Sequence, residues 1–126
     1  MRVFKTRSVA RFCKSEGITD KQLAAAIARA EKGLIDADLG GGLIKQRIAR
    51  QGQGKSSGWR TVIAYRAGHR AVFLFGFAKS DLDNIAPDDL AAFKETAQTM
   101  RTASEAYFAA ALKDNRLQEI DYEQKD

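Results

Sequence analysis

Hydrophobic residues change their spacing several times along the chain, and each change predicts a different element. Residues 2–5 form a short, partly apolar segment, which indicates a first strand. Val9, Phe12 and Cys13 are then spaced three positions and one position apart, which places them on one face of a helix. We therefore predict a helix over residues 6–16.

A second helix is indicated by its ends as well as by its apolar positions. Gly17 suits the end of the first helix, because glycine adopts a left-handed conformation freely. Thr19 and Gln22 have the spacing of a capping box, and Gly33 closes the segment. We expect the two helices to form a helical hairpin. A DNA-reading helix–turn–helix would look similar, but the second helix is mostly alanine, which favours a structural pair that covers a sheet.

From residue 34 the apolar period becomes two, which predicts strands. Glycines at 40–42 and the segment 67–69 supply turns between them. The expected strands are 34–38, 43–50, 59–66 and 70–77, and the last is almost wholly apolar, as a strand covered on both faces would be. Short connections between consecutive strands predict an antiparallel meander.

The last third of the chain returns to a helical spacing. Pro87 and the two acids after it suit the first turn of a helix, whose apolar stripe runs to Met100. A new capping pattern at 102–105 predicts a break, after which the apolar face continues to Leu112. Residues 116–122 are expected to form a late strand or an extended arm.

These elements predict an α+β fold: an N-terminal helical hairpin packed on a small antiparallel sheet, a meander, followed by C-terminal helices. The 126 residues fit one domain, which we expect over 1–112, with an acidic C-terminal extension over 113–126. The net charge is +5, but residues 1–79 hold 16 Lys and Arg against 5 Asp and Glu, and the remainder holds 5 against 11. We expect the acidic part to shield the basic part or to contact a partner.

Composition excludes several classes of protein. Cys13 is the only cysteine and His69 the only histidine, so neither a disulfide framework nor a conventional zinc site is expected, and no metal or other cofactor is predicted. The chain has no run of about 20 apolar residues and no secretory signal at its start. We therefore expect a cytoplasmic protein with no membrane partner.

The most informative stretch is 39–80, which has no Asp or Glu. A solvated surface normally mixes the two signs to limit self-repulsion. Charges that only protect a sheet edge would explain one or two lysines, whereas here the sequence predicts a surface that binds a polyanion, and RNA is the favoured one. The cations of the stretch are Lys45, Arg47, Arg50, Lys55, Arg60, Arg66, Arg70 and Lys79.

Two further motifs lie in the same stretch. Residues 49–56 nearly match a nucleotide-binding phosphate loop, but a strand follows where that motif needs a helix, so ATP or GTP binding is not predicted. Gly76 indicates a bulge or the close approach of a ligand or another backbone. Lys79, directly after the apolar strand, is placed either to enter a site or to remain in solvent.

Taken together, the turn and strand at 42–47, the loop GKSSGWR at 54–60, the pair at 65–66 and the segment FGFAK at 75–79 resemble the RelE/ParE toxin superfamily. The resemblance covers about 1–100 and is greatest to the HigB-like, RelE-type branch. It implies the toxin of a type II toxin–antitoxin system, with a cognate antitoxin as partner. The implied activity is cleavage of mRNA on the ribosome without a metal, by attack of a ribose 2′-OH on the adjacent phosphate.

The resemblance also implies site residues. Lys55 and Arg60 match the basic loop and the strand after it, and Lys79 matches the residue after the last strand, so these three are the predicted catalytic residues. Either lysine could act as the base if neighbouring cations lower its pKa, and arginine suits the stabilisation of the pentavalent phosphate. RNA backbone contacts are predicted for Lys45, Arg47, Arg50 and Arg66.

The sequence departs from the family near its end, where many relatives carry a catalytic or stacking Tyr or His. Tyr107 and Tyr122 lie on uncertain elements, and His69 lies in a turn, so the general acid is not identified. Two alternatives to the nuclease are a ParE-like inhibitor of DNA gyrase and a nucleic-acid-binding module without catalysis. Codon preference, the antitoxin and the oligomeric state do not follow from the sequence.

Overall fold

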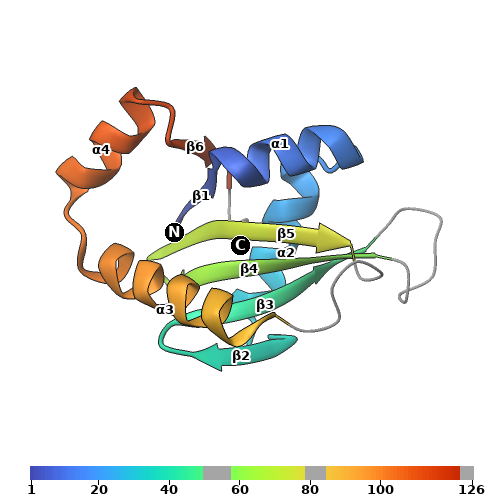
Figure 1. Cartoon of the computed structure of the whole chain (residues 1–126). Helices are drawn as coiled ribbons and strands as arrows, with labels where there is room; N and C mark the ends of the chain where they lie inside the picture. Colours follow the sequence, from blue (N-terminus) through green and yellow to red (C-terminus); the bar gives the residue numbers. More distant parts are fainter. Residues whose placement is uncertain (50–57, 79–84, 123–126) are drawn as a thin grey trace.

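The computed structural model describes residues 1–49, 58–78 and 85–122. Within these ranges, six strands form one sheet and four helices cover it (Figure 1). The elements, in chain order, are β1 (Arg2–Thr6), α1 (Arg7–Glu16), α2 (Asp20–Glu31), β2 (Ala37–Gly40), β3 (Leu43–Ile48), β4 (Trp59–Arg66), β5 (Arg70–Ala78), α3 (Pro87–Thr102), α4 (Glu105–Lys113) and β6 (Leu117–Ile120).

The α+β class is confirmed, but the predicted arrangement needs two corrections. The fold opens with β1, which matches the strand predicted over residues 2–5, so the helical pair is not its first element. The two helices also contact different strands: α1 lies against β5 and β1, whereas α2 lies against β3. The sheet is also not purely antiparallel. Its order is β2-β3-β4-β5-β1-β6, with β1 parallel to β5 and β6 antiparallel to β1. The meander β2 to β5 is therefore only one part of a mixed sheet.

Local signals fix both ends of the first two helices. The Thr6 side chain accepts a hydrogen bond from the Val9 amide at the start of α1, and Gly17 ends that helix with φ 74°. Thr19 and Gln22 form the predicted capping box at the start of α2. The helices bury their apolar stripes against one face of the sheet, with the following side chains among the buried residues: Val9, Cys13, Leu23, Ala26, Ile27, Ile44, Ile63 and Phe73.

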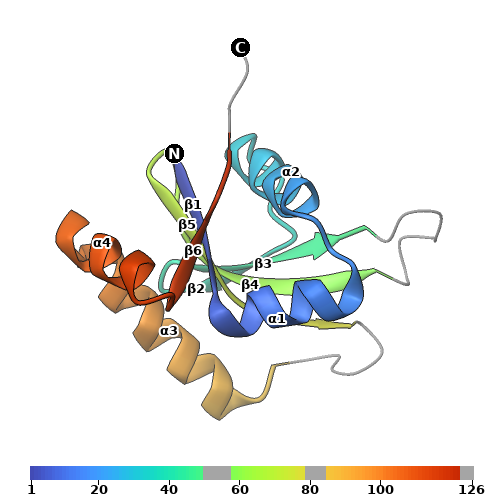
Figure 2. The same cartoon turned by 90° about the horizontal axis from the view of Figure 1, so that it is seen from above.

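The opposite face of the sheet carries α3. Figure 1 shows α3 in front of the strands and α2 behind them, and Figure 2 shows the two helices on opposite sides of the sheet. The predicted helix break is confirmed, since α3 ends at Thr102 and Ser104 caps α4 by accepting from the Tyr107 amide. Phe4, Val72, Ala97, Met100 and Phe108 are among the buried residues of this second core.

The boundaries of the strand predicted over 34–38 changed for a physical reason. The strand was expected from residue 34, but β2 begins at Ala37. The buried Gln46 side chain accepts from the Asp36 amide at 2.7 Å and donates to the Leu34 carbonyl at 3.2 Å. These side-chain bonds satisfy backbone groups that a strand partner would otherwise have to satisfy.

Candidate cationic site

Strand alternation places the basic residues of β3 and β4 on one face of the sheet. Arg47 lies directly opposite Arg60, and Arg60 in turn lies opposite Phe77 of β5. Lys45 lies opposite Val62, one row along on the same face. This is the face of the second core, which contains Val62 and Phe77. We call Lys45, Arg47 and Arg60 the cationic row.

The cationic row is unusual because like charges directly opposite one another destabilise a strand pair. All three side chains are half-buried. Among the described residues, no carboxylate lies within 4.0 Å of the charged groups of Lys45, Arg47 or Arg60. Towards the described residues, Arg60 donates a single long hydrogen bond, 3.4 Å, to the carbonyl of Trp59. Towards the described residues, the row therefore leaves its charge uncompensated and most of its side-chain N–H donors unused.

The backbone beneath the cationic row is held by side chains on the open edge of β3. The Arg47 amide donates to a carboxylate oxygen of Asp36 at 2.6 Å, and Arg29 donates to the Arg47 carbonyl. Asp36 also pairs with Arg29 at 3.5 Å. Asp36 is thus committed to the backbone and to a different arginine, which fixes Arg47 in place without neutralising its side chain.

Three predicted site residues, Arg50, Lys55 and Lys79, lie outside the described residues. The described strands next to these segments end side by side: Trp59, at the start of β4, pairs with Ile48 at the end of β3 and with Ala78 at the end of β5. The pair Arg47 and Arg60 lies one position in from these strand ends.

Arg66 does not join the cationic row. It lies at the other end of β4, opposite Arg70, and six residues of strand separate it from Arg60, which corresponds to about 20 Å. The structure therefore divides the predicted cations of the sheet into two groups at opposite ends of β4.

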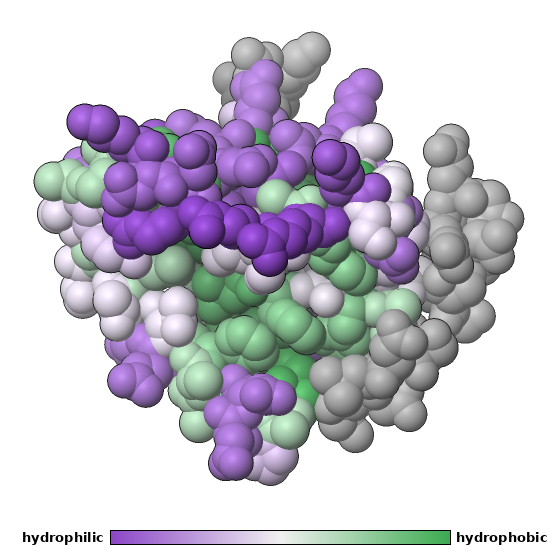
Figure 3. Space-filling view, turned by 45° about the horizontal axis from the view of Figure 1, so that its top comes forward, coloured by the Kyte–Doolittle hydropathy of each residue, from purple (hydrophilic) through white to green (hydrophobic). Residues whose placement is uncertain are grey.

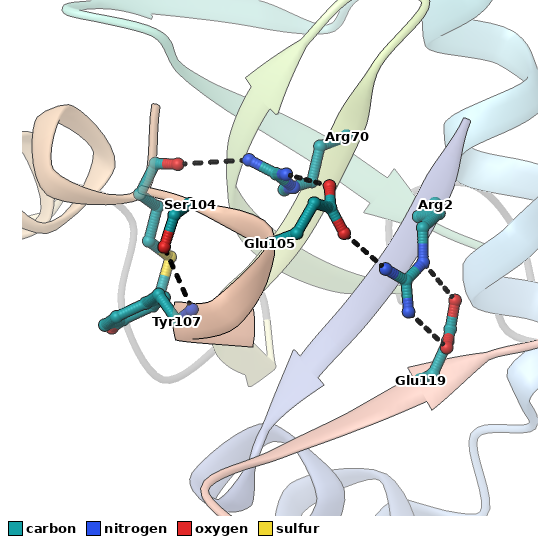
Figure 4. Close-up of polar contacts among 7 residues, drawn as sticks. Arg2, Arg70, Ser104, Glu105, Tyr107 and Glu119 are labelled. Atoms are coloured by element: carbon teal, nitrogen blue, oxygen red, sulfur yellow. Dashed lines mark hydrogen bonds and ion pairs between the residues drawn. The ribbon is translucent and has the colours of Figure 1, made fainter. Parts of the chain in front are cut away.

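One cation of the acid-free stretch, Arg70, pairs in the folded chain with an acid from outside that stretch. Arg70 donates to Glu105 at 3.1 Å and to the carbonyl of Met100 at 3.3 Å (Figure 4), and its guanidinium lies 3.8 Å from the ring centre of Phe108. Glu105 also pairs with Arg2, which pairs with Glu119 of β6. The acids of the C-terminal part thus compensate Arg2 and Arg70. This network was not predicted, since each of its ion pairs joins residues that lie 35 or more positions apart in the sequence.

The other residues singled out from the sequence have structural surroundings. Burial and the Glu31 carboxylate, to which its hydroxyl donates, raise the pKa of Tyr65. Burial also raises the pKa of Tyr122, with a smaller contribution from Glu31. His69 lies in the turn after β4, and its backbone carbonyl accepts a hydrogen bond from the Arg2 amide. None of these contacts involves the cationic row.

Gly76 contacts an aromatic ring. A β-carbon at this position would lie 2.6 Å from a ring carbon of Phe12, so the absent side chain leaves room for α1 to pack on β5. The register irregularity of β5 lies one step away, between Val62 and Ile63 on the facing strand.

Apolar side chains lie on the second face beside Arg60, because Phe77 is its strand partner and the Phe75 ring contacts those of Phe77 and Phe93. Several side chains of that core are only partly buried, among them Phe75, Phe93 and Leu112. The space-filling view shows hydrophobic residues gathered below a band of hydrophilic ones (Figure 3). Fixed guanidinium groups beside apolar surface can bind a phosphate strongly, because little water competes for their donors.

Two further observations concern metal sites and membrane-spanning helices. In the described ranges, no three His, Cys, Asp or Glu side chains lie together as metal ligands would. No described helix has the length and apolar character needed to cross a bilayer.

Comparison with known proteins places the chain in a family. A search of curated proteins found no match. The family model described as RelE toxin of the RelE/RelB toxin–antitoxin system matches residues 1–120. That match covers β1 through β6 and includes both groups of cations, so the chain belongs to the RelE toxin family.

Proposed function

We propose that this chain is the toxin of a type II toxin–antitoxin system and that it cleaves mRNA on the ribosome without a metal. The observation that carries the proposal is the half-buried pair Arg47 and Arg60, held directly opposite each other with no described acid at their charged groups. Such a pair is stabilised by a phosphate, whose oxygens accept hydrogen bonds from both guanidinium forks.

The proposed reaction begins with attack of a ribose 2′-OH on the adjacent phosphorus. The new O–P bond forms as the bond to the 5′-oxygen breaks, leaving a cyclic phosphate and a 5′-OH. Arg60 is proposed to stabilise the charge that develops on the phosphoryl oxygens, with Arg47 and Lys45 holding the backbone. Lys55 and Lys79 remain proposed for proton transfer, on the basis of the family resemblance.

The proposed partners are a cognate antitoxin and mRNA on the ribosome. The family description names an antitoxin for its members, and the apolar surface beside the cationic row is compatible with a protein partner. We propose a cytoplasmic location because ribosomes are the proposed site of action.

The test combines induction of the toxin in cells with primer extension on cellular mRNA. Wild-type protein is expected to produce discrete cleavage sites, and co-expressed antitoxin is expected to remove them. Arg60→Ala should reduce cleavage about 100-fold to 1,000-fold, as expected for loss of one fixed donor to a developing oxyanion. Thermal unfolding of each variant shows whether the fold is intact.

The matched control is Lys21→Ala/Lys32→Ala, which removes two exposed cations from the neighbourhood of α2 on the opposite side of the sheet. It should cleave like the wild type. Growth arrest with DNA damage and without mRNA cleavage would favour a gyrase inhibitor. Full cleavage by a folded Arg47→Ala/Arg60→Ala variant would refute the assignment of the row.

A further inference from the structure

A basic hollow lies at the opposite end of β4 from the cationic row. It has a volume of about 500 Å³ and is open to solvent. We call it the Arg66–Arg101 hollow; its lining residues are Arg66, Gln98, Arg101, Thr102 and Ala103. A smaller pocket adjoins it and shares Arg66 and Arg101, with Gly42, Met100 and Arg70 also in its wall. Residues from β4 and from the last turns of α3 thus converge on one concavity.

The charges in the hollow are only partly compensated. Arg70 is bound to Glu105, to the Met100 carbonyl and to the face of Phe108. Arg66 and Arg101 have no described carboxylate within 4.0 Å. Two guanidinium groups from different elements therefore face a shared space with no described anion between them, which is unfavourable unless an anion binds there.

The helix dipole explains only part of this arrangement. A cation in the last turn of α3 is favoured by the partial negative charge of the helix end, and Arg101 occupies that turn. However, Arg70 already donates to the Met100 carbonyl at the same helix end. The dipole also gives no reason for Arg66, which is an exposed residue at the end of a strand.

A further cation extends the basic surface along α3. Lys94 lies two turns before Arg101, on the same side of the helix. A β-carbon on Gly41 would lie 3.6 Å from Cγ of Lys94, and one on Gly42 would lie 3.8 Å from Nη1 of Arg101. The glycine turn between β2 and β3 therefore leaves space for both long side chains, with Lys94 against Gly41 and Arg101 against Gly42.

We propose that the Arg66–Arg101 hollow binds a backbone phosphate of RNA away from the scissile bond. The proposal rests on the proposed function, in which the cationic row holds the phosphate that reacts. Arg66 and Arg101 supply charged donors in a fork geometry suited to phosphate oxygens, and the Gln98 amide adds a neutral donor. At about 20 Å from Arg60, the hollow binds a different phosphate from the one at the row, either on the same strand or on ribosomal RNA.

The experiment uses three RNA probes: a tetranucleotide, a 20-nucleotide single strand and whole ribosomes. Binding of wild-type protein, Arg66→Ala/Arg101→Ala and the charge-preserving Arg66→Lys/Arg101→Lys is measured over a range of salt concentrations. Loss of the one phosphate that both arginines neutralise should reduce the salt slope for single-stranded RNA by about 0.7. The alanine variant should bind the tetranucleotide as the wild type does, and the lysine variant should keep the full slope.

The probes separate the sources of the phosphate. Weaker binding to the 20-nucleotide strand places the phosphate on the substrate strand, whereas an effect seen only with ribosomes places it on ribosomal RNA; either supports the proposal. Unchanged binding to all three probes overturns it, as does a variant that loses antitoxin binding and keeps RNA binding. Cleavage of cellular mRNA is measured in parallel: its absence with the wild-type protein would refute the proposed function itself, whereas full cleavage by Arg47→Ala/Arg60→Ala would refute only the assignment of the reacting phosphate to the row.

Discussion

The two ends of β4 carry similar cations in different environments. At one end, Arg60 faces Arg47 across the strand pair, and no described acid reaches either guanidinium. At the other end, Arg66 faces Arg70, and Arg70 is bound by Glu105. The Arg70 side chain is only 16% exposed, whereas that of Glu105 is 73% exposed. The buried charge at that end is neutralised from the protein's own surface.

This difference shows how the fold assigns roles to identical residues. Arg70 packs over Phe108 and bonds to the end of α3, so it connects the strand to both C-terminal helices. Arg47 and Arg60 make no comparable contact with any described acid. A cation that the fold has already compensated contributes to structure, and an uncompensated one in a rigid setting is available to a ligand.

The largest expected effect tests the packing beneath Arg70, the cation that Glu105 compensates. Phe108 is fully buried and stacks on Phe4, with ring centres 5.1 Å apart. Phe108→Ala should lower the free energy of unfolding by about 3–5 kcal/mol, because it removes a buried ring and leaves a cavity. Chemical denaturation measures the loss. A change below about 1 kcal/mol would show that α4 is not needed to hold this end of the sheet.

The next effect lies beside the uncompensated end. Gly76→Ala places a methyl group 2.6 Å from the Phe12 ring, so it should destabilise the fold by about 1–3 kcal/mol through overpacking. Phe12→Ala in the same chain removes the clash, so the double variant should be more stable than the sum of the two single changes predicts. Strict additivity in denaturation experiments would contradict the contact.

A smaller effect tests the comparison directly. Glu105→Gln removes the carboxylate that binds Arg70 and Arg2 and should cost about 1 kcal/mol or less, because Glu105 is largely exposed. It also frees one cation for RNA, so the salt slope for single-stranded RNA should steepen by up to about 0.7. An unchanged slope would show that Arg70 is committed to the Met100 carbonyl and Phe108 alone.

The smallest effect concerns pH. Hydrogen bonding to Arg2 lowers the pKa of Glu119 below its ordinary value of 4.5. The pair therefore stabilises the fold at pH values above about 4.5, and this contribution is lost as the pH falls through the lowered pKa. Glu119→Gln should reduce the acid sensitivity of the thermal midpoint slightly, since both side chains are well exposed. An unaltered pH profile would contradict the linkage.

Several features of the site followed directly from the sequence. Helix starts at Thr6 and Thr19 and the break before Ser104 depend on hydrogen bonds within three residues of the cap. The common face of Lys45, Arg47 and Arg60 depends on strand alternation and on consecutive strands pairing across one connection. Both kinds of signal are local, so composition and spacing reveal them.

Other features depended on contacts that spacing does not encode. Charge counting grouped Arg66 and Arg70 with the cationic row, because it records which acids are near in sequence and not which are near in space. Glu105 reaches Arg70 only after α3 and α4 have packed against the sheet. Gly76 suggested close approach of a ligand or backbone, but the neighbour is the ring of Phe12.

By itself, the sequence determined the helices, their caps, the alternating strands and the basic character of the β3–β4 face, because each of these depends on neighbours a few positions away. Only the tertiary structure decided that β1 lies between β5 and β6 and that the cations divide into two groups. It also decided that Glu105 and Glu119 neutralise Arg70 and Arg2 and leave the row uncompensated by any described acid. Those outcomes depend on strand order and helix packing, which bring together charges separated by as many as 117 positions.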